Sequence, residues 1–266
     1  MLEEKMKEYK SNAKINLMLK VVGRKDNLHL LEMVMVPISI YDIIQIEKSK
    51  EFIIEGMDID VEDNIMYKMF SYLKEKYKLQ ENIKIKVEKF IPTQAGLGGG
   101  SSNAATILKY VNEEMKLNLK EDEMISIGKN IGSDVSFFIK NAPSFVKGTG
   151  EDISVLNNFK QVKGILIFDN DYSSTKDVYD KIDDYEFSKA EGKFELINDL
   201  EKGISDQMKS KIDQIKTELK ASGAYATLMS GSGGSVFGLF ESENYIDKCI
   251  SHFKEKYYFV EKFVSL

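Results

Sequence analysis

The sequence is poor in the features that mark several classes of protein. Cys249 is the only cysteine among 266 residues, so no disulfide can form within the chain. No stretch approaches the roughly 18 apolar residues that a membrane-spanning helix needs, and the opening "MLEEKMKEYK" lacks the apolar core of a signal peptide. The net charge of −6 argues against a chain built to coat nucleic acid, which needs a basic face. We therefore expect a cytoplasmic protein with neither a membrane nor nucleic acid as its partner, although a nucleotide can still bind in a local pocket.

What is present indicates an ordinary globular protein. Hydrophobic residues make up 42% of the chain and charged residues 30%, and 266 residues can bury a sizeable core in one large or two ordinary domains. The segment "NYIDKCISHFKEKY" has the apolar spacing of an amphipathic helix. We expect Cys249 to be a buried residue of this helix rather than a reactive thiol.

The first half of the chain predicts strands followed by helices. Apolar and polar residues alternate over 13–22 and over 83–87, which indicates half-buried strands, and apolar runs near 30–40, 42–47 and 52–54 add further strands. An amphipathic helix follows "VEDN", with Asp63 as a candidate cap. Together these elements predict an α+β domain whose helices gather against one sheet.

The second half changes pattern at Gly164. The sequence predicts a strand at "GILIFD", helices near 175–183, 194–203 and 208–221, strands at "YATLM" and "SVFGLF", a helix over 243–256 and a final strand. With the middle helices merged, the order is β-α-β-β-α-β, the split-βαβ or ferredoxin-like pattern. The polar stretch 153–163 predicts the boundary, so we expect one domain over residues 1–157 and a ferredoxin-like domain over 158–266.

The segment "PTQAGLGGGSS", residues 92–102, is called the glycine loop here; it joins a predicted strand to a predicted helix. Gly96, Gly98, Gly99 and Gly100 fall within five positions, and either Ser101 or Ser102 can cap the helix. Unpaired N–H groups and the positive end of the helix dipole attract an anion there, and glycines allow its oxygens close to the backbone. The loop predicts a phosphate cradle, with a plain flexible turn as the alternative. It is neither a Walker loop, which needs a lysine where Ser101 stands, nor a dinucleotide fingerprint, which needs a second strand and an acidic residue downstream.

Three segments together resemble the GHMP small-molecule kinases: "AKINLMLKVVGRKDNLHLL" near the N-terminus, the glycine loop, and "LMSGSGGSVFGLF" near the C-terminus. The similarity covers essentially the whole chain. Within the family, "IYD" at 40–42, "EDN" at 62–64, "GSDVSFFI" at 132–139 and "SST" at 173–175 are similar to the motifs of members that phosphorylate a cytidyl diphosphate sugar alcohol. The resemblance implies an α+β, two-domain GHMP kinase fold with an N-terminal ATP-binding domain and a C-terminal ferredoxin-like domain.

The resemblance also assigns roles to individual residues. Lys14 and Asp134 would be catalytic, with Asp134 as acceptor of the hydroxyl proton and Lys14 as its cationic neighbour. The residues expected to bind ATP are Asn64, Lys89, Pro92, Gly96, Leu97, Gly98, Gly99, Gly100, Ser101 and Ser102. Mg²⁺ is implied by phosphoryl transfer, with Ser102 as a possible ligand. The structural alternatives are a capping or turn aspartate for Asp134, an exposed edge-strand lysine for Lys14, a helix-start asparagine for Asn64 and a solvated strand lysine for Lys89.

The residues expected to bind the second substrate are Asn16, His29, Tyr179, Gly231, Ser232 and Gly233. His29 and Tyr179 match the family's cytosine-recognition positions, but Leu28 stands where the family has an aromatic ring. Taken alone, His29 could be a surface histidine and "GSGG" a tight strand connection that packs beside the glycine loop. A kinase of mevalonate, homoserine or a sugar, and a non-catalytic nucleotide-binding module, are the alternative functions. We expect a monomer or a weak homodimer that acts on small molecules.

Overall fold

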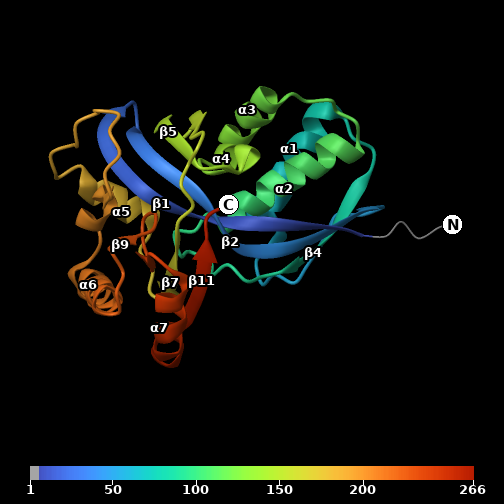
Figure 1. The fold of residues 1–266 in the computed structure, drawn as a ribbon. Helices are drawn as coiled ribbons and strands as arrows, with labels where there is room; N and C mark the ends of the chain where they lie inside the picture. The colour runs from blue at the N-terminus through green and yellow to red at the C-terminus, as the bar shows by residue number, and fades with distance from the viewer. Residues whose placement is uncertain (1–5) are drawn as a thin grey trace. The chain divides into compact units, whose positions relative to one another are not determined.

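A computed structural model describes residues 6–266, and these fall into two compact units that interleave along the chain (Figure 1). The first unit consists of the described residues up to Ala13, Tyr41–Ile91 and Gly98–Asn141; the second consists of Lys14–Ile40, Pro92–Leu97 and Ala142–Leu266. Two long strands, β1 (Lys7–Lys25) and β2 (Leu28–Ser49), run through both units. The linear boundary near residue 157 stays a prediction, because the two units exchange chain segments well before it.

The first unit contains the predicted strand before the glycine loop. It is β4 (Asn82–Glu88), antiparallel to the end of β2 and parallel to β3 (Ile53–Glu55). Ile83, Ile85 and Val87 are buried, whereas their neighbours in the chain are more exposed, as the alternation predicts. The two apolar runs at 30–40 and 42–47 form one strand, β2, because nothing interrupts it at the "IYD" motif.

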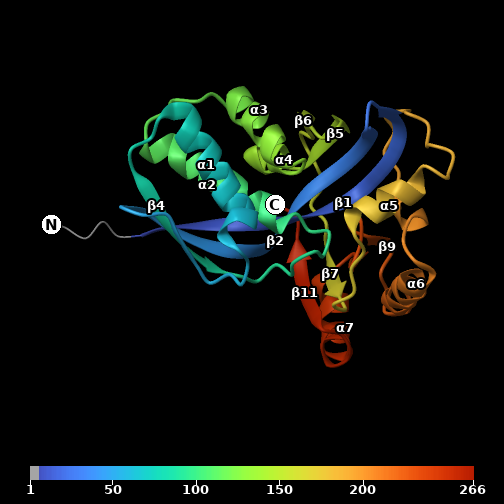
Figure 2. The same cartoon turned by 180° about the vertical axis from the view of Figure 1, so that it is seen from behind.

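Helices of the first unit gather on one face of these strands (Figures 1 and 2). They are α1 (Ile65–Tyr77), α2 (Gly99–Glu114), α3 (Glu121–Ile131) and α4 (Val135–Lys140), preceded by a short 3₁₀ turn η1 (Val61–Asp63). The predicted cap of α1 was wrong by one residue: Asn64 Oδ1 accepts a hydrogen bond from Met66 N at 2.9 Å, while Asp63 belongs to the 3₁₀ turn.

The second unit contains the predicted ferredoxin-like arrangement. Its elements are β7 (Lys163–Phe168), α5 (Thr175–Ile182), α6 (Asp206–Ala221), β9 (Ala226–Met229), β10 (Ser235–Leu239), α7 (Glu243–Lys256) and β11 (Phe259–Val264). The strands lie in the order β11-β7-β10-β9 and are all antiparallel. Helix α7 packs against β7 and β11, and α6 packs against β9 and β10 (Figure 2). The α+β class and both parts of the expected fold are therefore confirmed.

Three further strands of the second unit lie outside this four-stranded sheet. β5 (Ser144–Gly148) pairs with β2, β6 (Asp152–Val155) pairs with β5, and β8 (Ile197–Asn198) pairs in parallel with β1.

The predicted helix over 194–203 was wrong. The chain there forms β8 and the 3₁₀ turn η2 (Asp199–Lys202). Asn198 accepts from Leu200 N through Oδ1 at 3.0 Å and donates through Nδ2 to the carbonyls of Met229 and Gly231. Short polar side chains that bond to backbone groups in this way compete with helix formation.

Cys249 lies in α7, as predicted, but it is half-buried rather than buried. Burial still raises the pKa of its thiol, which favours the unreactive protonated form.

Candidate active site

The end of the glycine loop forms the start of α2. Gly98 has the left-handed φ of 68°, and the helix begins at Gly99 with no side chain of the described residues capping it. The prediction that Ser101 or Ser102 caps the helix was therefore wrong: both lie in its first turn, where Ser102 N already donates to Gly98 O at 2.9 Å. An α-helix whose first N–H groups lack a side-chain cap suits an anion, so the residues fit a bound phosphate.

The second glycine turn, residues 231–234, packs against the glycine loop. Gly96 has φ 76°, and a Cβ on it would overlap the carbonyl oxygen of Ser230 and lie 2.9 Å from that of Gly233. Ser230 Oγ donates to Gly96 O at 3.1 Å. The same turn links β9 to β10 as a hairpin, so both the predicted connection and the predicted packing are confirmed. Nearby, Ser232 Oγ lies 2.8 Å from Thr175 Oγ1.

Lys14 and Asn16 point to the same buried face of β1. Lys14 is 4% exposed, Asn16 is 0% exposed, and Lys14 Nζ donates to Asn16 Oδ1 at 2.5 Å. The backbone N–H of Lys14 also donates to Leu97 O, within the glycine loop, at 2.9 Å. The alternative of an exposed edge-strand lysine was wrong, because Lys14 is almost completely buried. A buried cation is costly unless polar groups surround it. Buried charged side chains of this kind are typical of functional sites.

Asp134 lies immediately before α4, in the first unit. Its backbone carbonyl accepts from Phe138 N at 3.3 Å, but its half-buried side chain does not cap the helix. Two residues earlier, Gly132 faces the start of α2: a Cβ on it would lie 3.8 Å from Ser101 Oγ. The turn that carries Asp134 therefore lies beside the predicted phosphate site. The pairing of Asp134 with Lys14 joins residues of the two units and stays a prediction.

Lys89 lies just after β4 and is held in place rather than solvated. Its Nζ donates to Asp42 Oδ2 at 2.7 Å and to Ile91 O at 2.5 Å. A Cβ on Gly99 would lie 3.3 Å from this ammonium, so Lys89 stands at the first residue of α2. Asn64 is the helix-start asparagine of the alternative interpretation, and its contact with ATP stays a prediction.

His29 and Tyr179, which the sequence analysis assigned to the same base, lie together in the second unit. Their ring centroids are 4.9 Å apart at an interplanar angle of 33°, and Phe187 stands edge-on to His29. His29 Nε2 lies 2.8 Å from Asp183 Oδ1, and Arg24 forms an ion pair with the other oxygen of that carboxylate. With its side chain only 10% exposed, His29 is not a surface histidine.

Two functional candidates were missed by the sequence analysis, Asp42 and Asp183. Each contacts a predicted site residue from a distant part of the chain. Asp42 belongs to the "IYD" motif, which was noted for its resemblance but given no role.

The described residues offer no ready-made metal cage. No group of three or more His, Cys, Asp or Glu among them could hold a metal ion. Ser102 is 4% exposed, and its Oγ accepts a hydrogen bond from Ser11 Oγ at 2.8 Å. Mg²⁺ in phosphoryl-transfer sites is commonly held by substrate phosphates with few protein ligands, which is the arrangement that these residues fit.

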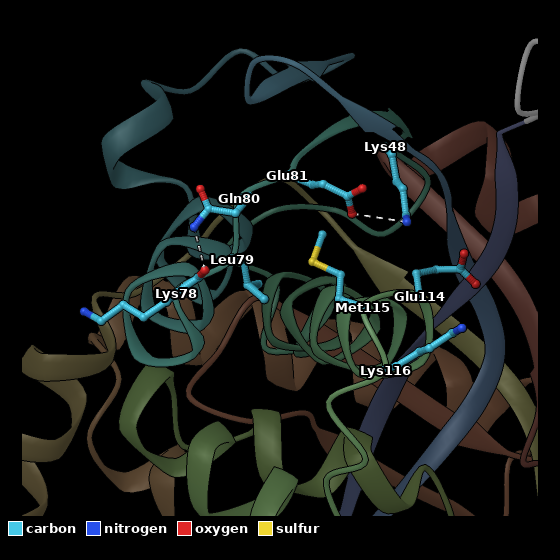
Figure 3. Close-up of a pocket in the computed structure, with 8 residues that line it drawn as sticks. All are labelled: Lys48, Lys78, Leu79, Gln80, Glu81, Glu114, Met115 and Lys116. Carbon is cyan, nitrogen blue, oxygen red and sulfur yellow. Dashed lines mark hydrogen bonds and ion pairs between the residues drawn. The ribbon is translucent and has the colours of Figure 1, made fainter. Parts of the chain in front are cut away.

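Two hollows of the first unit do not coincide with the predicted site. One, of about 490 Å³, is lined by Lys48, Lys78, Leu79, Gln80, Glu81, Glu114, Met115 and Lys116, and Figure 3 shows Lys48 and Glu81 paired across it. The other, of about 250 Å³, contains one predicted residue, Ser102. Over residues 6–266, no helix has both the length and the apolar character needed to cross a membrane.

Comparison with known proteins places the chain in a family. The profile for "GHMP kinases N terminal domain" matches residues 64–142, and that for "GHMP kinases C terminal" matches residues 180–258. Fold and sequence together define a small-molecule kinase. The chain belongs to the GHMP kinase family.

Two relatives named 4-diphosphocytidyl-2-C-methyl-D-erythritol kinase are similar over nearly the full length. The one from Clostridioides difficile (strain 630) is 37% identical, with 88% of this chain and 86% of the relative covered. The one from Clostridium botulinum (strain Langeland) is 36% identical, with 93% and 96% covered. A solved structure of 4-(cytidine 5'-diphospho)-2C-methyl-D-erythritol kinase matches with a TM-score of 0.83 and 25% identity, covering 97% of this chain and 99% of the other.

Proposed function

We propose that this chain transfers the γ-phosphate of ATP to the 2-hydroxyl of 4-diphosphocytidyl-2-C-methyl-D-erythritol, a step of non-mevalonate isoprenoid synthesis. The observation that carries the proposal is the His29–Tyr179 pair, whose tilted rings lie 4.9 Å apart and whose histidine is bonded to Asp183. Two neighbouring aromatic rings, one of them oriented by a carboxylate, suit a nucleobase, which neither mevalonate nor homoserine possesses. The names of the similar relatives agree with this choice.

The proposed chemistry follows the roles that the family resemblance gives to individual residues. The substrate's 2-hydroxyl oxygen bonds to the γ-phosphorus as the bond from that phosphorus to the bridging oxygen of ADP breaks, and Asp134 accepts the hydroxyl proton. The glycine loop binds the phosphates through its backbone N–H groups, and Lys14 offsets the negative charge on the transferred group. Mg²⁺, when bound, neutralises charge on the phosphate oxygens, with Ser102 as its proposed protein ligand.

Other parts of the proposal follow the sequence analysis. Asn64 and Lys89 bind the adenosine end of ATP, while Asn16 and the second glycine turn contact the acceptor substrate. Residues 1–157 and 158–266 serve as the ATP-binding and ferredoxin-like domains of a monomer or weak homodimer.

The direct test is turnover with competing acceptors. The protein is incubated with Mg-ATP and, in separate reactions, with the cytidyl substrate, mevalonate, homoserine or galactose, and ADP release is measured. We expect release above background with the cytidyl substrate alone. Faster release with another acceptor would replace the proposed substrate, and none with any acceptor, despite ATP binding, would support a non-catalytic module. Structures of mevalonate and homoserine kinases match at 13% and 17% identity, which shows the shared fold alone.

Replacing Leu28 with tyrosine is expected to lower KM for the cytidyl substrate several-fold while kcat changes little. Leu28 is 59% exposed and precedes His29, so a ring at this position can reach a base beside the histidine. A ring stacked on a base contributes about 1–3 kcal/mol, and an interaction made equally in the ground and transition states changes KM alone. KM is measured at saturating ATP, with Leu28→Met as the size-matched control that has no ring. An equal or higher KM in the tyrosine variant would mean that residue 28 does not face the base.

A further inference from the structure

Asp42 carries a completely buried carboxylate in β2 of the first unit. It is 0% exposed, and burying a charge is costly unless it is well partnered. Oδ1 accepts from the backbone N–H groups of Phe90 and Ile91, both at 2.8 Å. Oδ2 accepts from Lys89 Nζ at 2.7 Å and from Asn103 Nδ2 at 3.1 Å. Four donors match the roughly four acceptor positions of a carboxylate, so its hydrogen-bonding capacity is fully used.

The four donors come from the two chain segments that flank the glycine loop. Lys89, Phe90 and Ile91 immediately precede residue 92, and Asn103 immediately follows residue 102. One carboxylate therefore ties together the point where the chain enters the glycine loop and the point where it continues into α2. Fixing both ends of a loop reduces the conformations open to it, so a smaller entropic cost remains when a ligand orders the loop.

The side-chain amide of Asn103 is oriented by its hydrogen bond to Asp42. Its Nδ2 faces Asp42, while its Oδ1 is buried with no hydrogen-bond partner in the described structure. A buried unpaired acceptor costs about 1–3 kcal/mol. The contact with the carboxylate offsets that cost and keeps the first turns of α2 attached to β2.

Asp42 also sets the position of Lys89. The ammonium is held between Asp42 and the carbonyl of Ile91, at the first residue of α2. An ammonium has three N–H donors, and these two contacts orient it on a side chain that otherwise has about 2 kcal/mol of rotamer entropy. Asp42 thus fixes both a cation and a backbone segment next to the predicted phosphate site.

We propose that Asp42 is the positioning residue of the nucleotide site: it pre-organises the glycine loop and Lys89, and so determines the affinity for a nucleoside triphosphate. The inference rests on the proposed use of ATP and extends it to a residue that does not touch the nucleotide. It does not depend on which acceptor is phosphorylated.

The test is Asp42→Asn, which preserves shape but removes the charge and directs N–H donors at Lys89 or at the backbone N–H groups. We expect Kd and KM for ATP to rise about tenfold, with kcat within about twofold and KM for the acceptor unchanged. Kd is measured by calorimetry with ATP alone, which needs no acceptor substrate. Asn103→Ala, which removes only the tie to α2, is expected to move Kd in the same direction by a smaller factor and serves if Asp42→Asn does not fold.

Asp199→Asn is the matched control. Asp199 is also a buried aspartate, 2% exposed, that ties distant segments: it accepts from Val21 N at 2.9 Å, Ser188 Oγ at 2.6 Å and Lys202 Nζ at 2.9 Å. It lies in the second unit, and these three hydrogen bonds within the described residues reach none of the residues predicted to bind ATP. We expect both variants to lower Tm, and only Asp42→Asn to weaken ATP binding.

The outcomes separate the inference from the proposed function. Lower Tm with unchanged Kd for ATP in both Asp42→Asn and Asn103→Ala would reduce Asp42 to a structural residue and overturn the inference alone. Normal ATP binding by the unmodified protein without phosphorylation of the cytidyl substrate would overturn the proposed acceptor and leave the role of Asp42 intact. A matching rise of Kd in Asp199→Asn would trace the effect to lost stability and also overturn the inference.

Discussion

Asp134→Asn is expected to bind ATP normally and to lose turnover by a factor on the order of a hundred or more. An amide neither accepts the hydroxyl proton nor carries the negative charge that the lysine ammonium would stabilise. We expect the variant to fold, because the Asp134 side chain does not cap α4 and the helix contact that Asp134 makes, from Phe138 N, is to its backbone carbonyl. The asparagine variant preserves that backbone bond.

The measurement is steady-state kcat together with calorimetric Kd for ATP. Asp122→Asn is the control, because it neutralises an exposed aspartate in the first turn of neighbouring α3, within the same unit. We expect near-native kcat in the control. A native kcat in Asp134→Asn would remove Asp134 from the reaction and leave the glycine loop as the main catalytic element.

Gly96→Ala is expected to reduce the free energy of unfolding by about 3–5 kcal/mol, the range of severe single substitutions. Two penalties combine at this position. The backbone has φ 76°, which L-residues rarely adopt, and the new Cβ would overlap the carbonyl oxygen of Ser230 in the second glycine turn. Because that oxygen belongs to backbone held between β9 and β10, it has little room to move.

Gly192→Ala separates the two penalties. Gly192 has φ 64°, similar to that of Gly96, but a Cβ on it meets nothing within 4 Å. This control therefore contains the backbone strain without the overlap, and we expect it to cost about 1 kcal/mol. Urea unfolding of both variants gives the comparison. Equal losses would show that the two glycine-rich segments can move apart at no cost.

Local patterns predicted much of the fold. The alternation over 83–87 identified β4, and the order of apolar segments after Gly164 identified the ferredoxin-like unit, because side-chain period follows directly from strand and helix geometry. The wrong secondary-structure prediction arose where a side chain forms hydrogen bonds with residues far away in the sequence. Residues 194–203 have the composition of a helix, but Asn198 bonds to a hairpin about thirty residues away, and no local pattern contains that contact.

Some features of the candidate site could likewise be predicted from the sequence, and others could not. The position of the glycine loop at a helix start followed from chain order alone, whereas the cap did not, because Gly98 and Ser101 both suit a helix start and only the backbone conformation decides between them. His29 and Tyr179 could be placed together only through the family resemblance. The role of Asp42 could not be predicted although its motif was noted, since its partners lie 47 to 61 positions along the chain.

The interleaving of the two units has a consequence for how the protein is made. Residues Lys14–Ile40 are synthesised before Ala142–Leu266, yet both belong to the same unit, and Met18 in β1 pairs with Ile197 in β8. Until those late segments emerge, β1 and β2 expose apolar edges that have no permanent neighbour. The nascent chain therefore cannot complete one unit before starting the other, and the segments of β1 and β2 that pair with β8 and β5 stay unpaired until those later strands are synthesised.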